Sequence, residues 1–239
     1  MAIRTREHAY SVNGVNYEAR VCWDDSHGQP RPGVLVSHAW RGRSDFENAE
    51  AEQLARMGYV GFALDLYGKG VIGKSPQENQ RLMQPHLDDR AMLWRKLDAA
   101  LREVRSLPEV DARKLAAIGF CFGGLCVLDL ARNGADLRGV ASFHGLLSPP
   151  PTRKDCRFDG SVLVLHGWED PMAPPEQLTA LGRELTALGA DWQLHAYGHT
   201  LHAFTNPAAD DPANGLKFEP RANERARRAL KGFLGELFE

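Results

Sequence analysis

Long apolar runs are missing from the sequence. No stretch approaches the roughly 18 consecutive apolar residues that a membrane-spanning helix needs. The chain starts Met-Ala-Ile-Arg-Thr-Arg-Glu, which lacks the apolar segment of a signal peptide. We therefore expect a cytoplasmic protein that has no membrane partner.

Neither sign of charge is in excess. The 29 lysine and arginine residues stand against 31 aspartate and glutamate residues, which gives a net charge of −2, and like charges form no long block. Charge-driven binding to nucleic acid or to a membrane surface therefore has no basis in the sequence. We expect the partners to be small molecules and the protein to be a monomer or a homodimer.

Cysteines are few, and their spacing fits neither a disulfide framework nor a zinc site. The chain has 4 of them, at positions 22, 121, 126 and 156, with no CxxC pair and no cluster of cysteine and histidine. We expect free thiols. No metal site and no organic cofactor is expected either.

Repeats, low-complexity segments and flexible linkers are also missing. Pro149-Pro150-Pro151 comes nearest to a linker, but the alternation of strands and helices continues after it, so we interpret it as a stiff loop. The 239 residues are 43% hydrophobic and 25% charged, close to the average of soluble globular proteins. The sequence therefore predicts a single domain over residues 1–239.

What the chain does contain is an alternation of strands and helices. Asn13-Gly14 lies between two segments that alternate polar and apolar residues, which predicts an antiparallel hairpin at the start. The later alternation predicts an α/β fold with a mostly parallel central sheet and helices on both faces. The predicted strands are 7–10, 15–23, 34–37, 59–66, 115–120, 139–143, 162–166 and 192–197, and the helices are 45–57, 75–106 with an interruption near Pro85, 123–131, 175–188 and 221–237.

Two of the predicted helices begin with a capping box. Ser44 with Glu47, and Ser75 with Glu78, have the spacing at which each side chain of the pair accepts a hydrogen bond from a backbone amide of the other residue. These pairs predict where the two helices start.

The segment Gly119-Phe120-Cys121-Phe122-Gly123-Gly124 carries the chemistry. It stands where a buried strand ends and a helix begins, which is the context of a nucleophile on a sharp turn between small residues. Such a turn is strained, and the close backbone approach needs glycine on both sides of the nucleophile. The alternative is that Cys121 is an ordinary buried cysteine.

An acid and a histidine follow in the order that this kind of site requires. Asp170 stands on a loop after the strand 162–166, with Glu169 as the rival acid and a turn or capping role as the alternative for Asp170. The histidine is His199 or His202, both in the loop after the last strand. His195 lies within that strand, where a packing role is preferred.

Three motifs in this order resemble the dienelactone hydrolase family of α/β-hydrolases over nearly the full length. The resemblance implies the α/β-hydrolase fold and assigns Cys121, Asp170 and His202 as a catalytic triad, with His199 in a structural role. The motifs are the G-x-C-x-G-G turn, Leu165-His166-Gly167-x-x-Asp170-Pro171, and Tyr197-x-His199-x-x-His202-x-Phe204.

An oxyanion hole needs two backbone donors that converge on the developing negative oxygen. One is expected to be the amide of Phe122, which follows the nucleophile and opens the helix. By similarity to the family, the second is the amide of Trp40 in the loop after strand 34–37, with Ala39 as the next choice.

The chain departs from its family at two positions that handle substrate. Well-studied members carry a glutamate where this chain has Ala39, and an arginine where it has Asn206, which helps to hold a substrate carboxylate. Arg81 and Arg90, or Arg41 and Arg43, are candidates to replace that cation, and Phe204 is a further candidate substrate contact. Dienelactone itself is therefore one candidate substrate among several.

The predicted activity is hydrolysis of small esters or lactones through a thioester acyl-enzyme on Cys121. A thiolate leaves more easily than an alkoxide, so enol and phenol esters are favoured over alkyl esters and amides. Two other hypotheses stay open: a redox-responsive thiol protein that uses Cys121, and a catalytically silent small-molecule-binding member of the fold.

Overall fold

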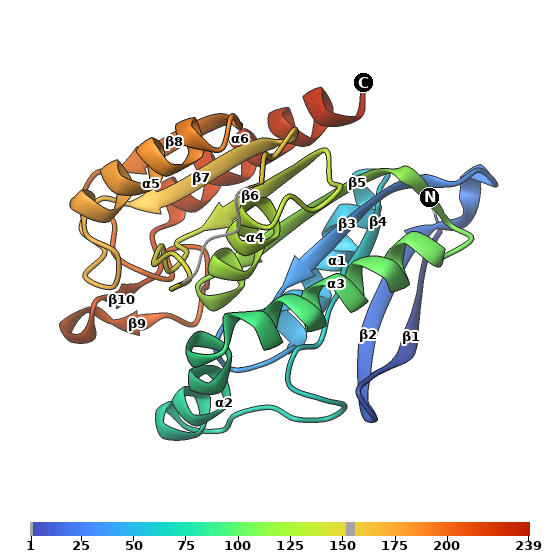
Figure 1. Cartoon of the computed structure of the whole chain (residues 1–239), viewed down its shortest axis with the longest axis horizontal. Coiled ribbons are helices and arrows are strands. Elements are labelled where there is room, and N and C mark those ends of the chain that lie inside the picture. Colours follow the sequence, from blue (N-terminus) through green and yellow to red (C-terminus); the bar gives the residue numbers. More distant parts are fainter. Residues whose placement is uncertain (1, 152–155) are drawn as a thin grey trace. The chain divides into compact units, whose positions relative to one another are not determined.

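The structure is a computed structural model that describes residues 2–151 and 156–239. These residues form two compact units, Met1–Ala117 and Ile118–Glu239, and each unit is described by itself. Figure 1 labels the strands and helices of both. The expectation of a single domain over the whole chain stays a prediction.

The first unit opens with the predicted hairpin. Strands β1 (Ile3–Val12) and β2 (Val15–Asp24) pair antiparallel along their full length. The turn between them places Asn13 at φ 50° and Gly14 at φ 80°, the left-handed conformation that asparagine and glycine adopt most readily. The antiparallel hairpin is thereby confirmed.

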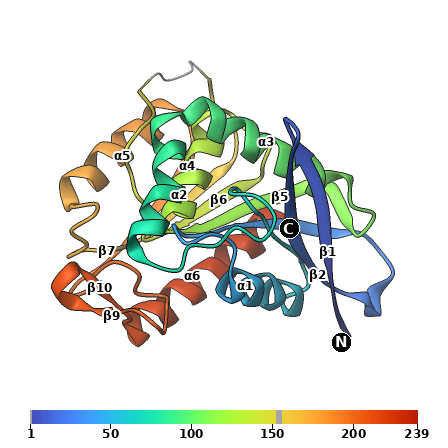
Figure 2. The same ribbon diagram turned by 90° about the horizontal axis from the view of Figure 1, so that it is seen from below.

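Four strands of the eight-stranded sheet, in the order β1-β2-β4-β3, form the centre of the first unit. Strands β3 (Arg31–Ser37) and β4 (Val60–Ala63) are parallel, and β2 runs antiparallel to β4. Helix α1 (Asp45–Arg56) covers one face and α3 (Arg90–Ser106) covers the other, as Figure 2 shows. The residues of β4 are all buried, in keeping with a strand covered on both faces.

The helix starts follow the capping predictions, with one difference. At α1 the capping box is complete. The Ser44 side chain accepts from the amides of the first helical turn, and the Glu47 carboxylate accepts from the amide of Ser44. At α2 (Pro76–Asp88), Ser75 accepts from the amide of Glu78 as expected. The carboxylate of Glu78 instead accepts from the amide of Lys74, at 2.8 Å, so the second box is shifted by one residue.

The helical region predicted for 75–106 is two helices. Pro85 lies inside the last turn of α2, and the break comes at Asp89. The side chain of Asp89 accepts a hydrogen bond of 2.7 Å from the amide of Met92, which caps α3. The proline therefore precedes the interruption and does not form it.

Strand β5 (Val110–Phe120) runs from the first unit into the second, where the strand order is β5-β6-β7-β8. Strands β6 (Gly139–Phe143), β7 (Ser161–Gly167) and β8 (Asp191–Tyr197) are parallel to one another. Figure 2 shows α4 (Phe122–Arg132) and α5 (Pro175–Ala187) on one face of these strands and α6 (Pro220–Phe238) on the other. Each unit thus has the predicted parallel strands with helices on both faces.

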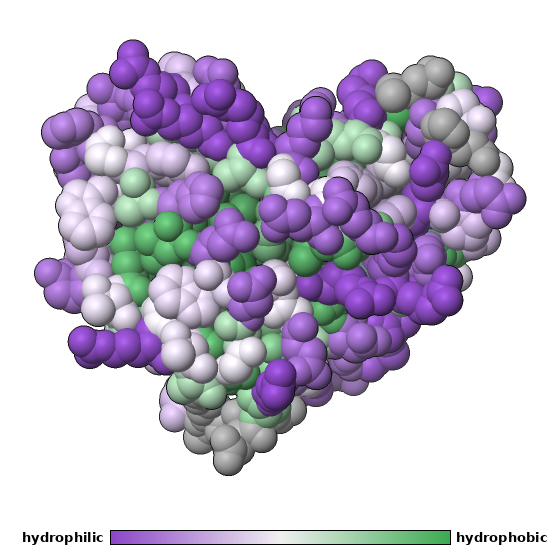
Figure 3. Space-filling view, turned by 90° about the horizontal axis from the view of Figure 1, so that it is seen from above, coloured by the Kyte–Doolittle hydropathy of each residue, from purple (hydrophilic) through white to green (hydrophobic). Residues whose placement is uncertain are grey.

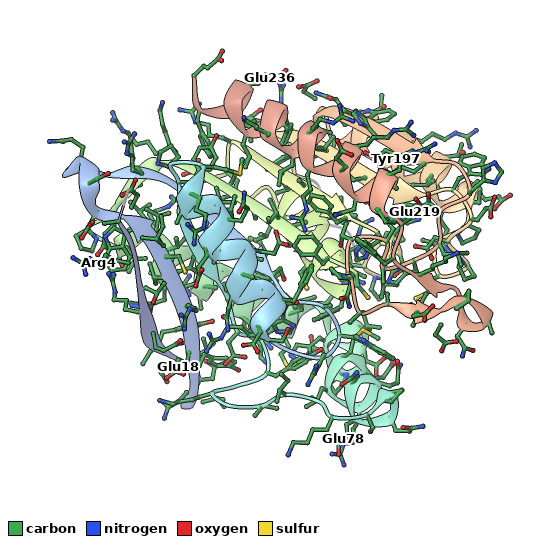
Figure 4. All side chains as sticks on the ribbon, turned by 180° about the vertical axis from the view of Figure 1, so that it is seen from behind. Arg4, Glu18, Glu78, Tyr197, Glu219 and Glu236 are labelled. Atoms are coloured by element: carbon green, nitrogen blue, oxygen red, sulfur yellow. The ribbon has the colours of Figure 1, made fainter. Side chains whose placement is uncertain are left out.

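Between β8 and α6 the chain contains an element that the sequence did not indicate. Strands β9 (Asp210–Asp211) and β10 (Leu216–Lys217) form a small antiparallel pair. Figure 4 labels Tyr197 at the end of β8 and Glu219 just before α6, the two residues that bracket this segment.

Figure 3 shows one face of the molecule, on which hydrophobic residues gather toward the middle and hydrophilic residues surround them. Among the described residues, no helix combines the length and the apolar character that crossing a membrane requires. Five large apolar side chains are exposed, namely those of Val15, Val71, Trp168, Met172 and Trp192.

Candidate active site

Cys121 occupies the sharp turn that the sequence predicts. It lies between β5 and α4, with φ 56° and ψ −116°, a backbone conformation that is strained for any residue other than glycine. A Cβ added to Gly119 would come within 2.0 Å of the carbonyl oxygen of Gly123, and one added to Gly124 within 2.6 Å of the Cα of Gly145. The glycines are therefore required, and the Cys121 side chain stays partly exposed.

The neighbouring strand fixes the turn from its other side. The amide of Cys121 donates to the carbonyl of Phe143 at 3.0 Å, and the amide of Leu146 donates to the carbonyl of Cys121 at 3.3 Å. Both bonds connect the turn to the end of β6. The thiol also stands at the N-terminus of α4, where the helix dipole favours negative charge.

Asp170 and His202 form a buried pair. Asp170 follows β7 and His202 follows β8, and both side chains are about 1% exposed or less. Nδ1 of His202 lies 2.7 Å from Oδ2 of Asp170. The other carboxylate oxygen of Asp170 accepts from the amide of Met172 at 2.8 Å, which fixes the orientation of the carboxylate.

Backbone hydrogen bonds join the loop of the acid to the loop of the histidine. The amide of Trp168 donates to the carbonyl of Tyr197 at 2.8 Å, and that of Glu169 donates to the carbonyl of Thr200 at 3.0 Å. His202 itself bridges to β10, through its amide to Gly215 at 2.9 Å and through its carbonyl to the amide of Lys217 at 3.1 Å. The unpredicted β9–β10 segment is thus a support for the histidine.

The rival acid and the rival histidine pair with each other outside this site. Nδ1 of His199 lies 3.2 Å from Oε1 of Glu169, and their side chains are 98% and 52% exposed. Exposed pairs of this kind contribute little to stability. The structure therefore separates a buried Asp170–His202 pair from a solvated Glu169–His199 pair.

The charge state of His202 depends on Cys121. Burial lowers the pKa of His202, but the negative charge of the Cys121 thiolate and the carboxylate of Asp170 raise it to about 10. Nε2 of His202 is buried and has no hydrogen-bond partner of normal geometry among the described residues. The raised pKa favours the imidazolium form of His202 at neutral pH.

Two more buried histidines surround the pair, and sequence reasoning gave neither a role. Nε2 of His166 lies 3.5 Å from Oδ2 of Asp170 and 3.0 Å from the carbonyl of Ala173. The ring of His144 packs against that of His202, with the centroids 5.0 Å apart. Burial lowers the pKa of both His144 and His166. Within the described ranges, no group of acidic, histidine and cysteine side chains is arranged to hold a metal.

The predicted oxyanion loop after β3 belongs to the first unit. The amide of Ala39 donates to Oε1 of the buried Glu47 at 3.1 Å, so this donor is already used. The amide of Trp40 makes no hydrogen bond within the described part of the chain. Its carbonyl accepts from the hydroxyl of Tyr67 at 2.9 Å, which helps to hold the loop. An oxyanion role for the amide of Trp40 stays a prediction.

The arginines that are candidates to bind a substrate carboxylate differ in their present contacts and exposure. Arg43 pairs with Glu7 at 2.9 Å, and the Nε of Arg41 donates to the carbonyl of Gly73 at 3.1 Å. Arg81 is exposed on α2, and Arg90 is half-buried at the start of α3. A substrate contact by Arg81 or Arg90 stays a prediction.

Two further candidates lie in the histidine loop. Phe204 is fully buried and packs against His144 and Tyr197, so a substrate contact by its ring is a prediction that this packing does not support. The side chain of Asn206 accepts from the amide of Ala208 at 3.0 Å in a local turn. Asn206 carries no charge, so it supplies no cation to this loop.

The model of the dienelactone hydrolase family matches residues 18–238. The solved structure named m3DLH is 37% identical, with a TM-score of 0.95 and 100% of both chains covered. The "Dienelactone Hydrolase-like Promiscuous Phospotriesterase P91 from Metagenomic Libraries" is 35% identical, also with a TM-score of 0.95 and 100% of both chains covered.

One similar curated protein carries a substrate in its name. The "Probable 2-oxo-3-(5-oxofuran-2-ylidene)propanoate lactonase" of Bradyrhizobium sp is 28% identical over 72% of this chain and 73% of its own. More distant solved structures that match the fold include α/β hydrolases. The α/β-hydrolase fold expected from the order of the motifs is confirmed.

Proposed function

The chain belongs to the dienelactone hydrolase family and is an ester or lactone hydrolase, and from this premise we propose that Cys121, Asp170 and His202 form its catalytic triad. The observation that carries the proposal is the buried 2.7 Å contact between Asp170 and His202, together with the electrostatic coupling of His202 to Cys121. Cys121 is the nucleophile, His202 the acid and base, and Asp170 fixes the tautomer and orientation of the imidazole.

In the first half-reaction, the Cys121 thiolate attacks the carbonyl carbon and the carbonyl electron pair moves to its oxygen. We propose that the amides of Phe122 and Trp40 bind this oxyanion. Collapse of the tetrahedral intermediate breaks the bond to the leaving oxygen, which takes the proton from Nε2 of His202. The product is a thioester on Cys121 and a neutral imidazole.

In the second half-reaction, His202 takes a proton from water, and the resulting hydroxide attacks the thioester carbonyl. Collapse expels the Cys121 thiolate and restores the thiolate–imidazolium pair. The acid product leaves in its carboxyl form and ionises in water. Atoms and charges balance without any redox partner.

The nature of the leaving group tests this mechanism. Because a thiol has a pKa of about 8.5, the first intermediate returns to substrate unless the leaving oxygen is also a weak base. We expect p-nitrophenyl esters and enol lactones to be hydrolysed at least about 100-fold faster than ethyl esters of the same acids. A panel with matched acyl groups measures this as kcat/KM. Equal rates for the ethyl esters would contradict a thioester mechanism.

The same panel tests the substrate charge. Because Asn206 replaces a cation of the family, neutral activated esters should compete well with lactones that bear a carboxylate. A strong preference for the anionic lactones would show that another cation binds the substrate carboxylate. The variants Arg81→Gln and Arg90→Gln would then identify that cation, because its loss should raise KM for the anionic lactones but not for neutral esters. Rapid peroxide oxidation of Cys121 with no turnover of any ester would instead favour the redox-responsive hypothesis.

The charge state of Cys121 gives an independent prediction. Because the pKa of His202 is raised to about 10, its imidazolium persists at pH 7 and keeps the thiolate ionised, and it is lost only as the pH rises through about 10. We expect iodoacetamide to modify Cys121 faster than a free thiol at pH 7. Between pH 6.5 and 7.5 the rate should change little, whereas that of a simple thiol rises about tenfold.

Peptide mapping by mass spectrometry locates the alkylated residue, and His202→Ala is the matched variant. The variant should lose most of the excess rate and regain the pH dependence of a simple thiol. An alkylation rate in the native protein no higher than that of glutathione would reject the resting ion pair.

Phosphotriester hydrolysis is a second candidate activity, because P91, named a promiscuous phosphotriesterase, is similar over the whole chain. In this reaction the Cys121 thiolate attacks phosphorus and expels an aryloxide, and water then cleaves the resulting S–P bond. Release of p-nitrophenol from paraoxon over many turnovers supports this activity, and a single stoichiometric release shows inactivation.

The partner of the site is a small molecule, as expected for a hydrolase of this family. A cytoplasmic location and a monomeric or homodimeric state are proposed from the sequence alone. Fractionation of cells and light scattering of the purified protein measure them.

A further inference from the structure

We propose that His144, anchored by Thr205, is a positioning residue that holds the His202 imidazole in the orientation in which Nε2 serves Cys121. The proposal rests on the triad proposed above. It concerns a histidine that the chemical steps do not use and that lies in the second unit with the whole triad.

The backbone ties His144 to both the nucleophile and the acid. It directly follows Phe143, whose carbonyl accepts the amide of Cys121, and its own amide donates to the carbonyl of Leu165 in β7 at 2.8 Å. His144 has φ 36°, a left-handed conformation that is uncommon for residues other than glycine, although asparagine, aspartate and histidine adopt it more readily than most. The chain thus turns sharply here and directs a large ring, only 3% exposed, into the interior.

The His144 ring packs against the catalytic imidazole. Its centroid lies 5.0 Å from that of His202, with an angle of 68° between the planes, and 5.3 Å from that of Phe204, with an angle of 78°. Nε2 of His144 lies 2.8 Å from Oγ1 of Thr205, a buried residue three positions after His202. His144 therefore contacts the histidine loop at three points, of which one is polar and directional.

A second contact on His202 has a mechanical purpose. The hydrogen bond from Nδ1 to Asp170 restrains the ring on one edge, but the ring can still rotate slightly about its side-chain bonds. A ring packed against the plane of His202 opposes this rotation and so determines the direction of Nε2. A displacement of a catalytic atom by about 1 Å is enough to lower the rate about 100-fold.

The charges around His144 are compatible with this role. Burial, followed by the positive charges of His202 and His166, lowers the pKa of His144 well below its usual value, so the ring stays neutral next to the His202 imidazolium. The charged groups that act on it in this unit are His202, His166 and Arg227, with Asp170 beyond His202. A second positive charge would repel the imidazolium, whereas a neutral ring packs against it.

The test uses Thr205→Val, which keeps the size of the side chain but removes the hydroxyl, with Thr205→Ser as the matched control. We expect the valine variant to lower kcat about tenfold to 100-fold with KM within twofold of the native value. The serine variant should stay within twofold in both. His144→Leu should match the valine variant, and His144→Phe, which retains a ring, should recover part of the loss. Thermal unfolding shows whether each variant is folded.

A readout without substrate separates this proposal from the triad itself. The pH dependence of iodoacetamide modification of Cys121 should become that of a simple thiol in Thr205→Val and His144→Leu, but not in Thr205→Ser. If the native protein shows no His202-dependent alkylation, the triad proposal fails. If it does, and both variants keep kcat and the alkylation profile within twofold, the positioning role of His144 is wrong.

Discussion

Replacement of Cys121 by alanine is expected to lower kcat/KM for p-nitrophenyl acetate by roughly 10³- to 10⁶-fold, because only the attacking atom is removed. The fold should survive, because the side chain is only partly buried on the turn between β5 and α4. The helix start and the glycine contacts of the turn depend on the backbone and are unchanged. Steady-state kinetics and thermal unfolding of the same preparation measure both expectations.

Cys156→Ala is the matched control. Cys156 is also partly exposed, and its thiol donates to the carbonyl of Arg132 at 3.0 Å. Its replacement should leave kcat/KM within about twofold. Loss of activity in Cys156→Ala with retention in Cys121→Ala would remove the nucleophile assignment.

The second large effect concerns the histidine. His202→Ala should lower kcat by about 10²- to 10⁴-fold, the usual contribution of general acid and base catalysis, whereas His199→Ala should change it less than about threefold. The reason is burial: His202 is 1% exposed and bound to Asp170, and His199 is 98% exposed. The pH profile of kcat measures the same group independently.

The acids supply a parallel comparison. Asp170→Asn removes the acceptor for Nδ1 of His202 and allows the wrong tautomer, so a loss comparable to that of His202→Ala is expected. Glu169→Gln alters only the exposed pair with His199 and should be mild. A larger loss of kcat in Glu169→Gln than in Asp170→Asn would assign the acid of the triad to Glu169. In the same way, a larger loss in His199→Ala than in His202→Ala would assign the histidine to His199.

The Cys121 turn was predictable because it is local. Gly119 reflects a contact between residues close in sequence, because a Cβ there would approach the carbonyl oxygen of Gly123 to 2.0 Å, whereas Gly124 is required by the distant Gly145. The hairpin at Asn13-Gly14 and the capping box of α1 are local in the same sense, and both are confirmed. Periodicity also located the remaining strands and helices to within a few residues.

The contacts that hold His202 were not predictable from the sequence, because they join residues that are distant in the chain. His144 and Thr205 are 61 positions apart and meet only in the folded chain. The β9–β10 pair has two residues in each strand, too few to produce an alternating pattern. One signal was present in the sequence: a histidine directly after a buried strand, at the carboxyl edge where the other site residues also lie.

The most direct test of the account is to trap the acyl-enzyme. The protein is mixed briefly with p-nitrophenyl acetate, quenched in acid and digested, and the peptides are identified by mass spectrometry. The account predicts a burst of p-nitrophenol close to one equivalent and a single acetyl group on Cys121, removable by hydroxylamine. Acetylation of another side chain that turns over at the catalytic rate, with Cys121 unmodified, would contradict it.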